Sequence, residues 1–221
     1  MPSKPTACAV ITGNDMAAIK KASPLVDIFE VRIDLIGQDW REVVPALEKP
    51  WIATNRMAAE GGKWSGSEAR RKAELVDACE LGASMADIEL ASENLESIVA
   101  MIKKRAKCLV SYHNFEITPG LDELKNIVEK MLAAGADACK VVATAGTFED
   151  NITMLKLLRA YPQVRLTAFA MGDIGLPSRA LGPLIGGMVY TSLHKGNGSA
   201  PGQFTASEWR ELYRLVRGDH S

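Results

Sequence analysis

The residue of this sequence whose setting most clearly indicates reactivity is a lysine inside an apolar run. Lys140 lies in the run ADACKVVAT, among small and apolar neighbours. Because burial disfavours a charged ammonium, we expect the pKa of Lys140 to fall. A neutral amine is a nucleophile toward ketones and aldehydes, so this position predicts imine chemistry. The alternative is a lysine that is salt-bridged or that extends its ammonium to solvent.

A histidine ends a second apolar run and would supply the base that imine chemistry needs. His113 closes the run CLVSYH, whereas His194 lies in a glycine-rich stretch and His220 in the C-terminal tail. Histidine is the side chain whose ordinary pKa suits proton transfer near neutral pH. A structural histidine with satisfied hydrogen bonds is the alternative. Together, Lys140 and His113 predict an amine that forms an imine with a base beside it.

Charged residues at alternate positions mark two further runs. In FEVRIDL, a strand would place Glu30, Arg32 and Asp34 on one face as an acid–base–acid row. A structural ion-pair ladder explains this row equally well. Asp87 and Glu89 repeat the spacing, and together these acids could bind a hard metal ion. No cluster of His or Cys accompanies them and arginines offer counter-charges, so we predict no metal site.

A third run ends in a basic residue and a tight loop. Arg56 ends the run TNR, and Glu60 follows four residues later, before Gly61 and Gly62. Paired glycines allow tight backbone turns, so this loop could carry Glu60 back over the site. The motif EGG is a weak signal by itself.

Two glycine-rich stretches offer donors for an anion. MGDIGLPSR contains Arg179, and HKGNGSAPGQ contains Ser199 and Gln203. Backbone N–H groups in such loops bind anions, and the Arg179 and Ser199 side chains would add donors. Plain turn formation is the alternative for both stretches.

The sequence alternates short apolar runs with helical patterns, and these elements must position the residues above. Eight strands are predicted: Ala7–Thr12, Asp27–Ile33, Trp51–Asn55, Ala86–Leu90, Cys108–His113, Ala138–Ala143, Val164–Ala170 and Gly187–Ser192. One helix is predicted to begin at Ser67 and end at Gly82, and another to begin at Ser92. Three more are predicted over Leu121–Ala134, Thr147–Ala160 and Ser207–Arg217. The pitch of about 28 residues is typical of a βα unit.

This alternation predicts an α/β fold, a (β/α)8 TIM barrel formed by residues 1–221 as a single domain. An open doubly wound sheet is the alternative, but the turn after its first strand is usually glycine-rich, and TGNDMAA has one glycine. Parallel barrel strands are buried on both faces, so polar residues at their carboxyl ends point to the active site.

Composition excludes several classes of protein. The 221 residues are 47% hydrophobic and 24% charged, as in ordinary globular proteins, which argues against disorder and coiled coils. Lys and Arg total 26 against 27 Asp and Glu, so we expect no nucleic-acid or membrane partner. The four cysteines form no CxxC pair and predict buried free thiols in a reduced compartment. With no signal-peptide pattern or long apolar run, we predict a cytoplasmic protein.

Six motifs in order resemble those of one known family, the type I 3-dehydroquinate dehydratases. The family-like segments are FEVRID, TNRMAAEGG, SYHNFEITP, ADACKVVA, AMGDIGLPSR and SAPGQ, which together extend over most of the chain. The resemblance implies a Schiff-base-forming (β/α)8 barrel of the shikimate pathway, a hydro-lyase that converts 3-dehydroquinate to 3-dehydroshikimate and water. It also implies a stand-alone enzyme without metal, flavin or nucleotide, and a possible homodimer.

The resemblance assigns roles to the residues already singled out. Lys140 would form the imine, His113 would move protons and Glu60 would orient His113. The substrate carboxylate would be held by Arg179, Ser199 and Gln203, and the ring hydroxyls by Glu30, Arg32 and Arg56. Two alternatives remain open at this point: another imine-forming barrel such as a class I aldolase, and a non-catalytic barrel that binds a small anion.

Overall fold

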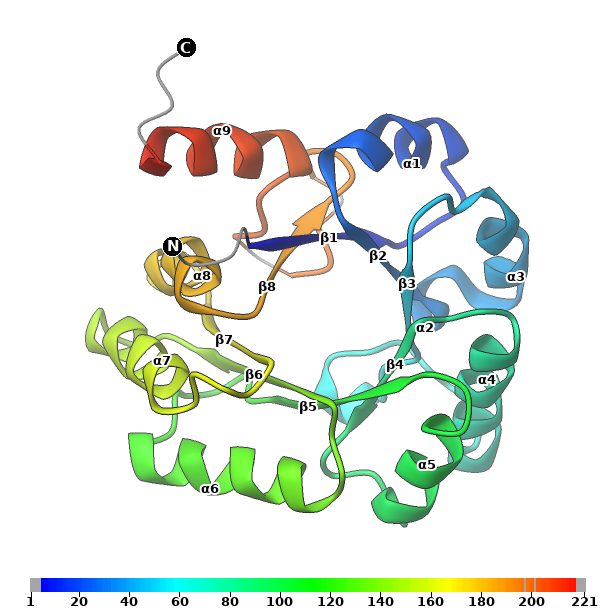
Figure 1. Cartoon of the computed structure of the whole chain (residues 1–221), viewed down its shortest axis with the longest axis horizontal. Coiled ribbons are helices and arrows are strands. Elements are labelled where there is room, and N and C mark those ends of the chain that lie inside the picture. Colours follow the sequence, from blue (N-terminus) through cyan, green and yellow to red (C-terminus); the bar gives the residue numbers. More distant parts are fainter. Residues whose placement is uncertain (1–4, 197, 201, 218–221) are drawn as a thin grey trace.

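The computed structural model describes residues 5–196, 198–200 and 202–217, and its strands form a nearly closed barrel (Figure 1). Eight parallel strands make up this sheet within the described residues. They are β1 (Thr6–Ile11), β2 (Ile28–Arg32), β3 (Trp51–Thr54), β4 (Met85–Glu89), β5 (Lys107–His113), β6 (Ala138–Thr144), β7 (Leu166–Met171) and β8 (Met188–Ser192). The predicted TIM barrel is therefore confirmed, and the doubly wound alternative is wrong.

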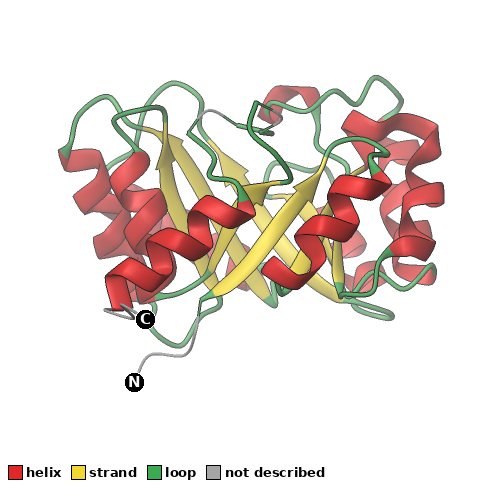
Figure 2. Cartoon of the chain, turned by 90° about the horizontal axis from the view of Figure 1, so that it is seen from above, coloured by secondary structure: helices red, strands yellow, loops and turns green. Residues whose placement is uncertain are grey.

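Helices surround the barrel, and the loops that carry the site join them to the strands (Figure 2). The helices are α1 (Met16–Ala22), α2 (Ile33–Ile36), α3 (Trp40–Val43), α4 (Glu68–Glu80), α5 (Leu95–Ile102), α6 (Leu121–Ala133), α7 (Glu149–Ala160), α8 (Leu176–Ile185) and α9 (Ala206–Arg217). Neighbouring strands pair in the order β7-β6-β5-β4-β3-β2-β1-β8. Between β7 and β8, the Met188 N–H donates to the Thr167 hydroxyl at 2.9 Å, so a side chain bridges the seam.

Alternate residues of each strand face the inside of the barrel. On β6, Lys140 faces inward, whereas Cys139 and Val141 belong to the core between the strands and the helices. Toward the amino ends of the strands, the interior of the barrel is apolar and includes Ile52, Met85 and Leu109. Polar and charged side chains occupy the same inward positions nearer the carboxyl ends of the strands. This division gives the barrel an apolar floor and a polar mouth.

The outer core holds the barrel and its helices in place. It contains fully buried side chains such as Trp40, Phe29, Leu75 and Ile88, which join the strands to the surrounding helices. Burial of each such large apolar side chain contributes roughly 1.5–3 kcal/mol to the stability of the folded protein. The packing of these side chains fixes where the strand ends lie. The four cysteines are free and buried, as predicted.

Two helix predictions differ from the structure. Ser67 does cap α4, accepting a hydrogen bond from the Arg70 N–H at 3.3 Å. Ser92, in contrast, does not begin α5, which follows Asn94 in a left-handed conformation with φ of 51°. The Ser92 hydroxyl instead accepts a hydrogen bond from Arg71 at 2.9 Å, so a tertiary contact takes the oxygen that would have capped the helix. Arg179, predicted to lie in a loop, belongs to the first turn of α8 together with the three residues before it.

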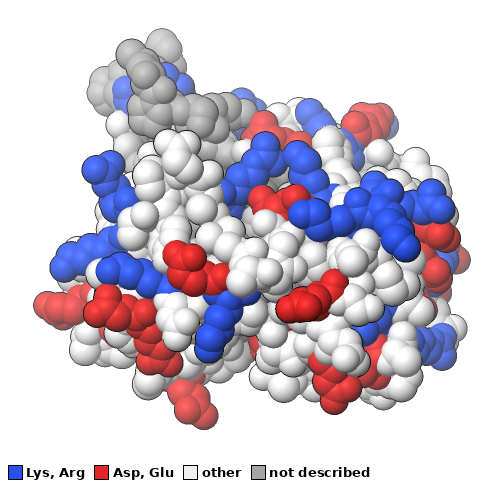
Figure 3. All heavy atoms as spheres, turned by 60° about the horizontal axis from the view of Figure 1, so that its bottom comes forward, with Lys and Arg blue, Asp and Glu red and all other residues white. Residues whose placement is uncertain are grey.

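The surface carries both signs of charge. Figure 3 shows Lys and Arg interspersed with Asp and Glu over the face in view, in keeping with a formal net charge of −1. In the described part of the chain, none of the helices combines the length and the apolar composition that crossing a membrane requires. Residue His220 lies outside the described residues, as do Asn197 and Pro201 of the second glycine-rich stretch.

The Ser67 cap leads to a stability prediction. Ser67→Ala removes the acceptor for the Arg70 N–H and should lower the free energy of unfolding by about 1 kcal/mol. Chemical denaturation of the two proteins measures the difference. Ser65→Ala, in the exposed loop just before the helix, is the matched control and should leave the midpoint unchanged. Equal midpoints for Ser67→Ala and wild type would contradict the capping role.

Candidate active site

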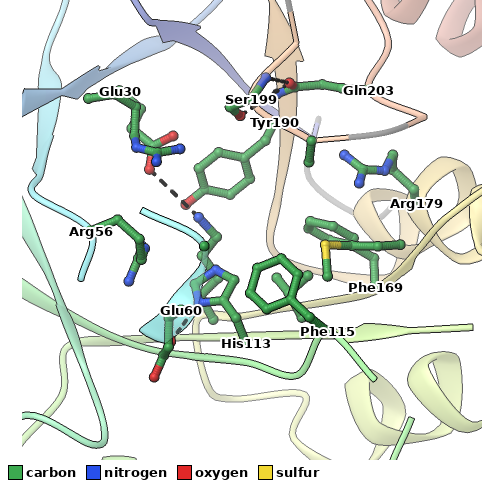
Figure 4. A pocket seen from close by; sticks show the side chains of 16 residues that line it. Glu30, Arg56, Glu60, His113, Phe115, Phe169, Arg179, Tyr190, Ser199 and Gln203 are labelled. Atoms are coloured by element: carbon green, nitrogen blue, oxygen red, sulfur yellow. Dashed lines mark hydrogen bonds and ion pairs between the residues drawn. The ribbon is translucent and has the colours of Figure 1, made fainter. Parts of the chain in front are cut away.

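One pocket at the mouth of the barrel gathers every residue that the sequence analysis places in a substrate site (Figure 4). It encloses about 620 Å³, counting the part that is open to solvent. Its lining includes the predicted residues Glu30, Arg32, Arg56, Glu60, His113, Lys140, Arg179, Ser199 and Gln203. These come from strands and loops far apart in the sequence, so the barrel is what brings them together.

Lys140 lies in the middle of the pocket wall with carboxylates on one side and an aromatic ring on the other. The residue is 7% exposed. Its Nζ lies 3.6 Å from Glu30 Oε1 and 3.8 Å from Asp87 Oδ2. The same Nζ lies 3.9 Å from the centre of the Tyr190 ring. The amine is therefore held away from bulk solvent but open to a molecule in the pocket.

His113 is held at one nitrogen by Glu60. The distance between His113 Nδ1 and Glu60 Oε2 is 2.8 Å, and both side chains are nearly buried. His113 ends β5, whereas Glu60 ends a 3₁₀ turn in the loop after β3. Because Nδ1 contacts Glu60, Nε2 is the ring nitrogen left for a ligand. The loop after β3 thus brings Glu60 back to the pocket, as the sequence predicted.

The two glycines after Glu60 make that loop possible. Gly61 has φ of 75°, and a Cβ there would overlap the ring of Phe115. A Cβ on Gly62 would overlap the backbone carbonyl of Arg56. Only a glycine allows such close approach, so the motif EGG sets the position of Glu60.

Burial shifts the pKa values of the pair in opposite directions. Burial raises the pKa of Glu60 to about 8; the nearby Arg56 charge opposes this, and Glu89 and Asp87 add to it. Burial also lowers the pKa of His113 well below 6.5, and the positive charges of Arg56 and Lys140 lower it further. The folded protein therefore disfavours an ionised Glu60 and a charged His113.

Arginines pair with the acidic side chains beneath the pocket. Arg56 contacts Asp87 Oδ2 at 2.6 Å and Glu89 Oε1 at 3.0 Å, and it donates to the Ser111 hydroxyl at 2.6 Å. Arg71, fully buried, contacts the other oxygen of Glu89 at 2.6 Å. Burial alone would raise the pKa of Asp87, but the charges of Arg56 and Lys140 outweigh it and hold that pKa low. In the described residues, no group of three His, Cys, Asp or Glu side chains has the arrangement of a metal site.

Only two of the three residues in the predicted acid–base–acid row lie on the strand. Glu30 and Arg32 lie on β2 and line the pocket, but Asp34 belongs to α2 rather than to the strand. Asp34 turns back to bind Arg32 through both oxygens, at 2.9 Å and 2.8 Å. Glu30 accepts a hydrogen bond from the Thr54 hydroxyl at 2.8 Å. The strand thus ends before Asp34, whose carboxylate fixes the Arg32 guanidinium.

The opposite wall supplies an arginine and polar groups that suit an anion. Arg179 lies 4.4 Å from the centre of the Phe169 ring, and burial lowers its pKa to about 10. The Gln203 side-chain oxygen accepts hydrogen bonds from the Ser199 N–H at 2.8 Å and from its hydroxyl at 3.2 Å. Gln203 therefore fixes Ser199 in the same pocket lining as Arg179.

Sequence reasoning missed the aromatic and apolar part of the lining. Phe115, Phe169, Met171 and Tyr190 line the pocket and give it walls that exclude water. Phe115 is 50% exposed, and its ring stacks on His113 with centres 6.3 Å apart. The inward parity of β7 and β8 is the signal that could have found Phe169 and Tyr190, but uninterrupted apolar strands hide that parity in the sequence.

The family model for type I 3-dehydroquinase matches residues 7–220. The chain belongs to this family. It is a hydro-lyase with the function of a type I 3-dehydroquinate dehydratase of the shikimate pathway, as the resemblance predicted.

Relatives and solved structures agree with this membership. The chain is 44% identical over 213 residues to a 3-dehydroquinate dehydratase of Dehalococcoides mccartyi, covering 96% of both chains. It is 35% identical over 206 residues to that of Methanocaldococcus jannaschii, covering 90% of this chain and 93% of the relative. The crystal structure of the 3-dehydroquinate dehydratase from Aquifex aeolicus superposes with a TM-score of 0.82 at 28% identity, covering 95% of this chain and 98% of the other.

The raised pKa of Glu60 predicts a pH-dependent effect of its substitution. At pH 4 the carboxyl is protonated in both the folded and the unfolded chain. Between about 4.5 and 8 the unfolded chain releases this proton while the folded chain retains it, so wild-type stability falls as pH rises. Glu60→Gln does not titrate, so its melting temperature relative to wild type should increase from pH 5 to pH 8, as thermal scans can measure.

The control is a carboxylate nearer the surface, Glu68, whose pKa shifts in the opposite direction. The hydrogen bond from Arg71 lowers the pKa of Glu68, so ionised Glu68 stabilises the folded protein above its unfolded pKa. Glu68→Gln should lose stability relative to wild type as pH rises above about 4. Parallel melting curves for Glu60→Gln and wild type would contradict the raised pKa of Glu60.

Proposed function

We propose that the dehydration proceeds through an imine between Lys140 and the ketone of 3-dehydroquinate, with His113 moving the protons. The observation that supports this most is that the Lys140 amine and the His113 ring line one pocket, with Glu60 2.8 Å from the far nitrogen of His113. An amine and a base of this kind are what imine chemistry requires.

The reaction begins with addition and loss of one water. The neutral amine of Lys140 adds to the C3 ketone, giving a carbinolamine. The C–O bond then breaks as His113 donates its Nε2 proton to the departing hydroxyl and takes up the Glu60 carboxyl proton at Nδ1, which leaves an iminium ion, water and an ionised Glu60. The iminium withdraws electrons from the neighbouring C2 atom and makes its proton acidic.

Elimination follows from the iminium. His113 accepts the C2 proton at Nε2, and the resulting enamine expels the C1 hydroxyl, which takes the proton back from His113. Water hydrolyses the remaining iminium, releasing 3-dehydroshikimate and the free amine, and the proton set free returns through His113 to Glu60. Glu60 keeps the ring oriented and stabilises its charged form through Nδ1, and positioned proton transfer of this kind contributes roughly 10²–10⁴ in rate. The covalent bond supplies the electron sink, so we propose no cofactor and no metal.

Groups around the two reacting residues would hold the substrate. Arg179, with Ser199 and Gln203 beside it, suits the carboxylate because a guanidinium matches two oxygens in one plane. Glu30 and Arg32 would hold ring hydroxyls. Arg56 would do so from a position already fixed by its ion pairs with Asp87 and Glu89.

Family membership favours dehydration over the alternatives from the sequence. A class I aldolase would share the lysine but cleave a carbon–carbon bond, and an anion-binding barrel would form no adduct. The relatives named 3-dehydroquinate dehydratase favour dehydration over both. The homodimer and the cytoplasmic location stay predictions; light scattering in solution measures the first.

Trapping the imine tests the mechanism. Mixing the protein with 3-dehydroquinate and sodium borohydride should add the mass of the reduced substrate, and peptide mapping should locate it on Lys140. Lys140→Ala should lose both turnover and adduct, whereas the control Lys156→Ala, on the exposed face of α7, should keep both. His113→Ala should accumulate an imine that turns over slowly. No adduct in a wild-type protein that fails to form product would contradict the mechanism.

Removing the arginine tests the carboxylate site. Arg179→Ala should raise KM about 10- to 100-fold with a smaller change in kcat, because hydrogen bonds to charged groups contribute roughly 1.5–3 kcal/mol. Steady-state kinetics with 3-dehydroquinate measure both constants. Arg159→Ala, at an exposed position of α7, is the control and should match wild type. An unchanged KM for Arg179→Ala would move the carboxylate site elsewhere.

A further inference from the structure

Two buried side-chain oxygens lack a hydrogen-bond partner within the part of the chain that the structure describes. They are Asn55 Oδ1 and the hydroxyl of Tyr190. A buried polar group without a partner destabilises a protein by roughly 1–3 kcal/mol. Asn55 is absent from the pocket lining, whereas Tyr190 lines the pocket directly. An unpartnered hydroxyl inside a substrate site is the one that a substrate can satisfy.

The Tyr190 side chain is fixed against the amine of Lys140. It extends inward from β8 between Glu30 and Arg179, as Figure 4 shows, and is 4% exposed. The Lys140 Nζ lies over its ring, 3.9 Å from the ring centre. An ammonium or iminium at this place is attracted to the face of the ring. The phenol therefore lies beside the bond that forms when the amine attacks.

Other hydroxyls near Lys140 already donate to carboxylates. The Thr54 hydroxyl donates to Glu30 at 2.8 Å, and the Ser111 hydroxyl donates to Asp87 at 2.6 Å. Burial raises the pKa of Tyr190 well above 10, and the charge of Glu30 adds to the effect. The phenol therefore keeps its proton at neutral pH. Of these three hydroxyls, that of Tyr190 is the one without a partner among the described residues, so its hydrogen is free to be donated.

We infer that the Tyr190 hydroxyl donates a hydrogen bond to the substrate's ketone oxygen as Lys140 adds to the carbonyl carbon. This inference rests on the imine mechanism proposed above and adds a catalytic residue to it. A carbon bonded to Nζ lies about 1.5 Å from it and carries its oxygen about 1.2 Å further. The ketone oxygen therefore comes within hydrogen-bond reach of groups adjacent to the amine.

The hydrogen bond assists the addition without a change in the proton count. The nitrogen lone pair forms the new C–N bond while the carbonyl π electrons move onto oxygen. The proton released by the nitrogen then neutralises that oxygen, giving the carbinolamine, and Tyr190 remains protonated throughout. A donor aimed at the oxygen where negative charge develops stabilises the transition state more than the ketone itself.

The experiment compares two tyrosine-to-phenylalanine variants of the full chain. Tyr190→Phe keeps the ring over Lys140 and removes only the hydroxyl. Tyr161→Phe is the matched control, because its hydroxyl lies on the outside of the barrel and does have partners, the Lys125 carbonyl at 3.2 Å and Glu129 at 2.8 Å. Rapid mixing with 3-dehydroquinate followed by borohydride quench and intact mass gives the rate of adduct formation, and thermal scans give the melting temperature.

The two variants should change in opposite ways. Tyr190→Phe should slow adduct formation on the order of 10²-fold, as loss of one such donor does in other enzymes. Its melting temperature should equal or exceed that of wild type, because the lost hydroxyl had no partner in the free protein. Tyr161→Phe should form the adduct at the wild-type rate and melt at a lower temperature.

The outcomes separate this inference from the mechanism on which it rests. An adduct that forms equally fast in Tyr190→Phe and wild type would overturn the role of the hydroxyl and leave the imine mechanism standing. A slower reaction accompanied by a lower melting temperature would assign the hydroxyl to structure and likewise overturn the inference. No adduct in wild type would overturn the imine mechanism itself.

Discussion

The ion pairs of Arg56 constrain the rest of the pocket. This guanidinium contacts Asp87 and Glu89, carboxylates that are buried beneath Lys140 and the loop after β3. Removing one partner of a buried ion pair destabilises a protein by about 3–5 kcal/mol, because the remaining charge has neither water nor a counter-charge. The same positive charge lowers the pKa of His113 and opposes the raised pKa of Glu60. One side chain thus affects both the packing of the pocket and the protonation of His113 and Glu60.

The barrel separates stability from chemistry along its axis. Apolar residues such as Ile52 and Leu109 fill the lower interior, and helices cover the outside of the strands. Charged groups gather at the mouth, where the strands end and loops can reach over them. Several of these groups are unfavourable for folding by themselves: Glu60 is buried with a raised pKa, and the Tyr190 hydroxyl has no partner among the described residues. The apolar core has to offset these terms, a common relation between function and stability.

The two sides of the pocket are built for different tasks. The wall formed by β2–β6 carries Lys140, His113 and the buried carboxylates, fixed by short ion pairs and hydrogen bonds. The wall formed by β7, α8 and the loop after β8 carries Arg179, Ser199 and Gln203 around the Phe169 ring. A side-chain hydrogen bond bridges the strands β7 and β8 at their other end. The residues proposed to move protons thus lie on the wall with the most fixed charges, and the groups suited to an anion lie opposite them.

Most of the elements and of the site's chemical groups could be predicted from the sequence. Short apolar runs predicted the eight strands to within a few residues, Ser67 marked a helix start, and the motifs named every charged residue of the pocket lining together with His113, Ser199 and Gln203. These features are local, because apolar runs and helix capping depend on neighbours along the chain. Three contacts followed from packing alone: Asp34 binds Arg32, Ser92 contacts Arg71 instead of capping α5, and the Tyr190 ring lies against Lys140. Each of these contacts joins side chains whose meeting depends on strand direction, loop path and burial, and those are set by the packing of the whole barrel.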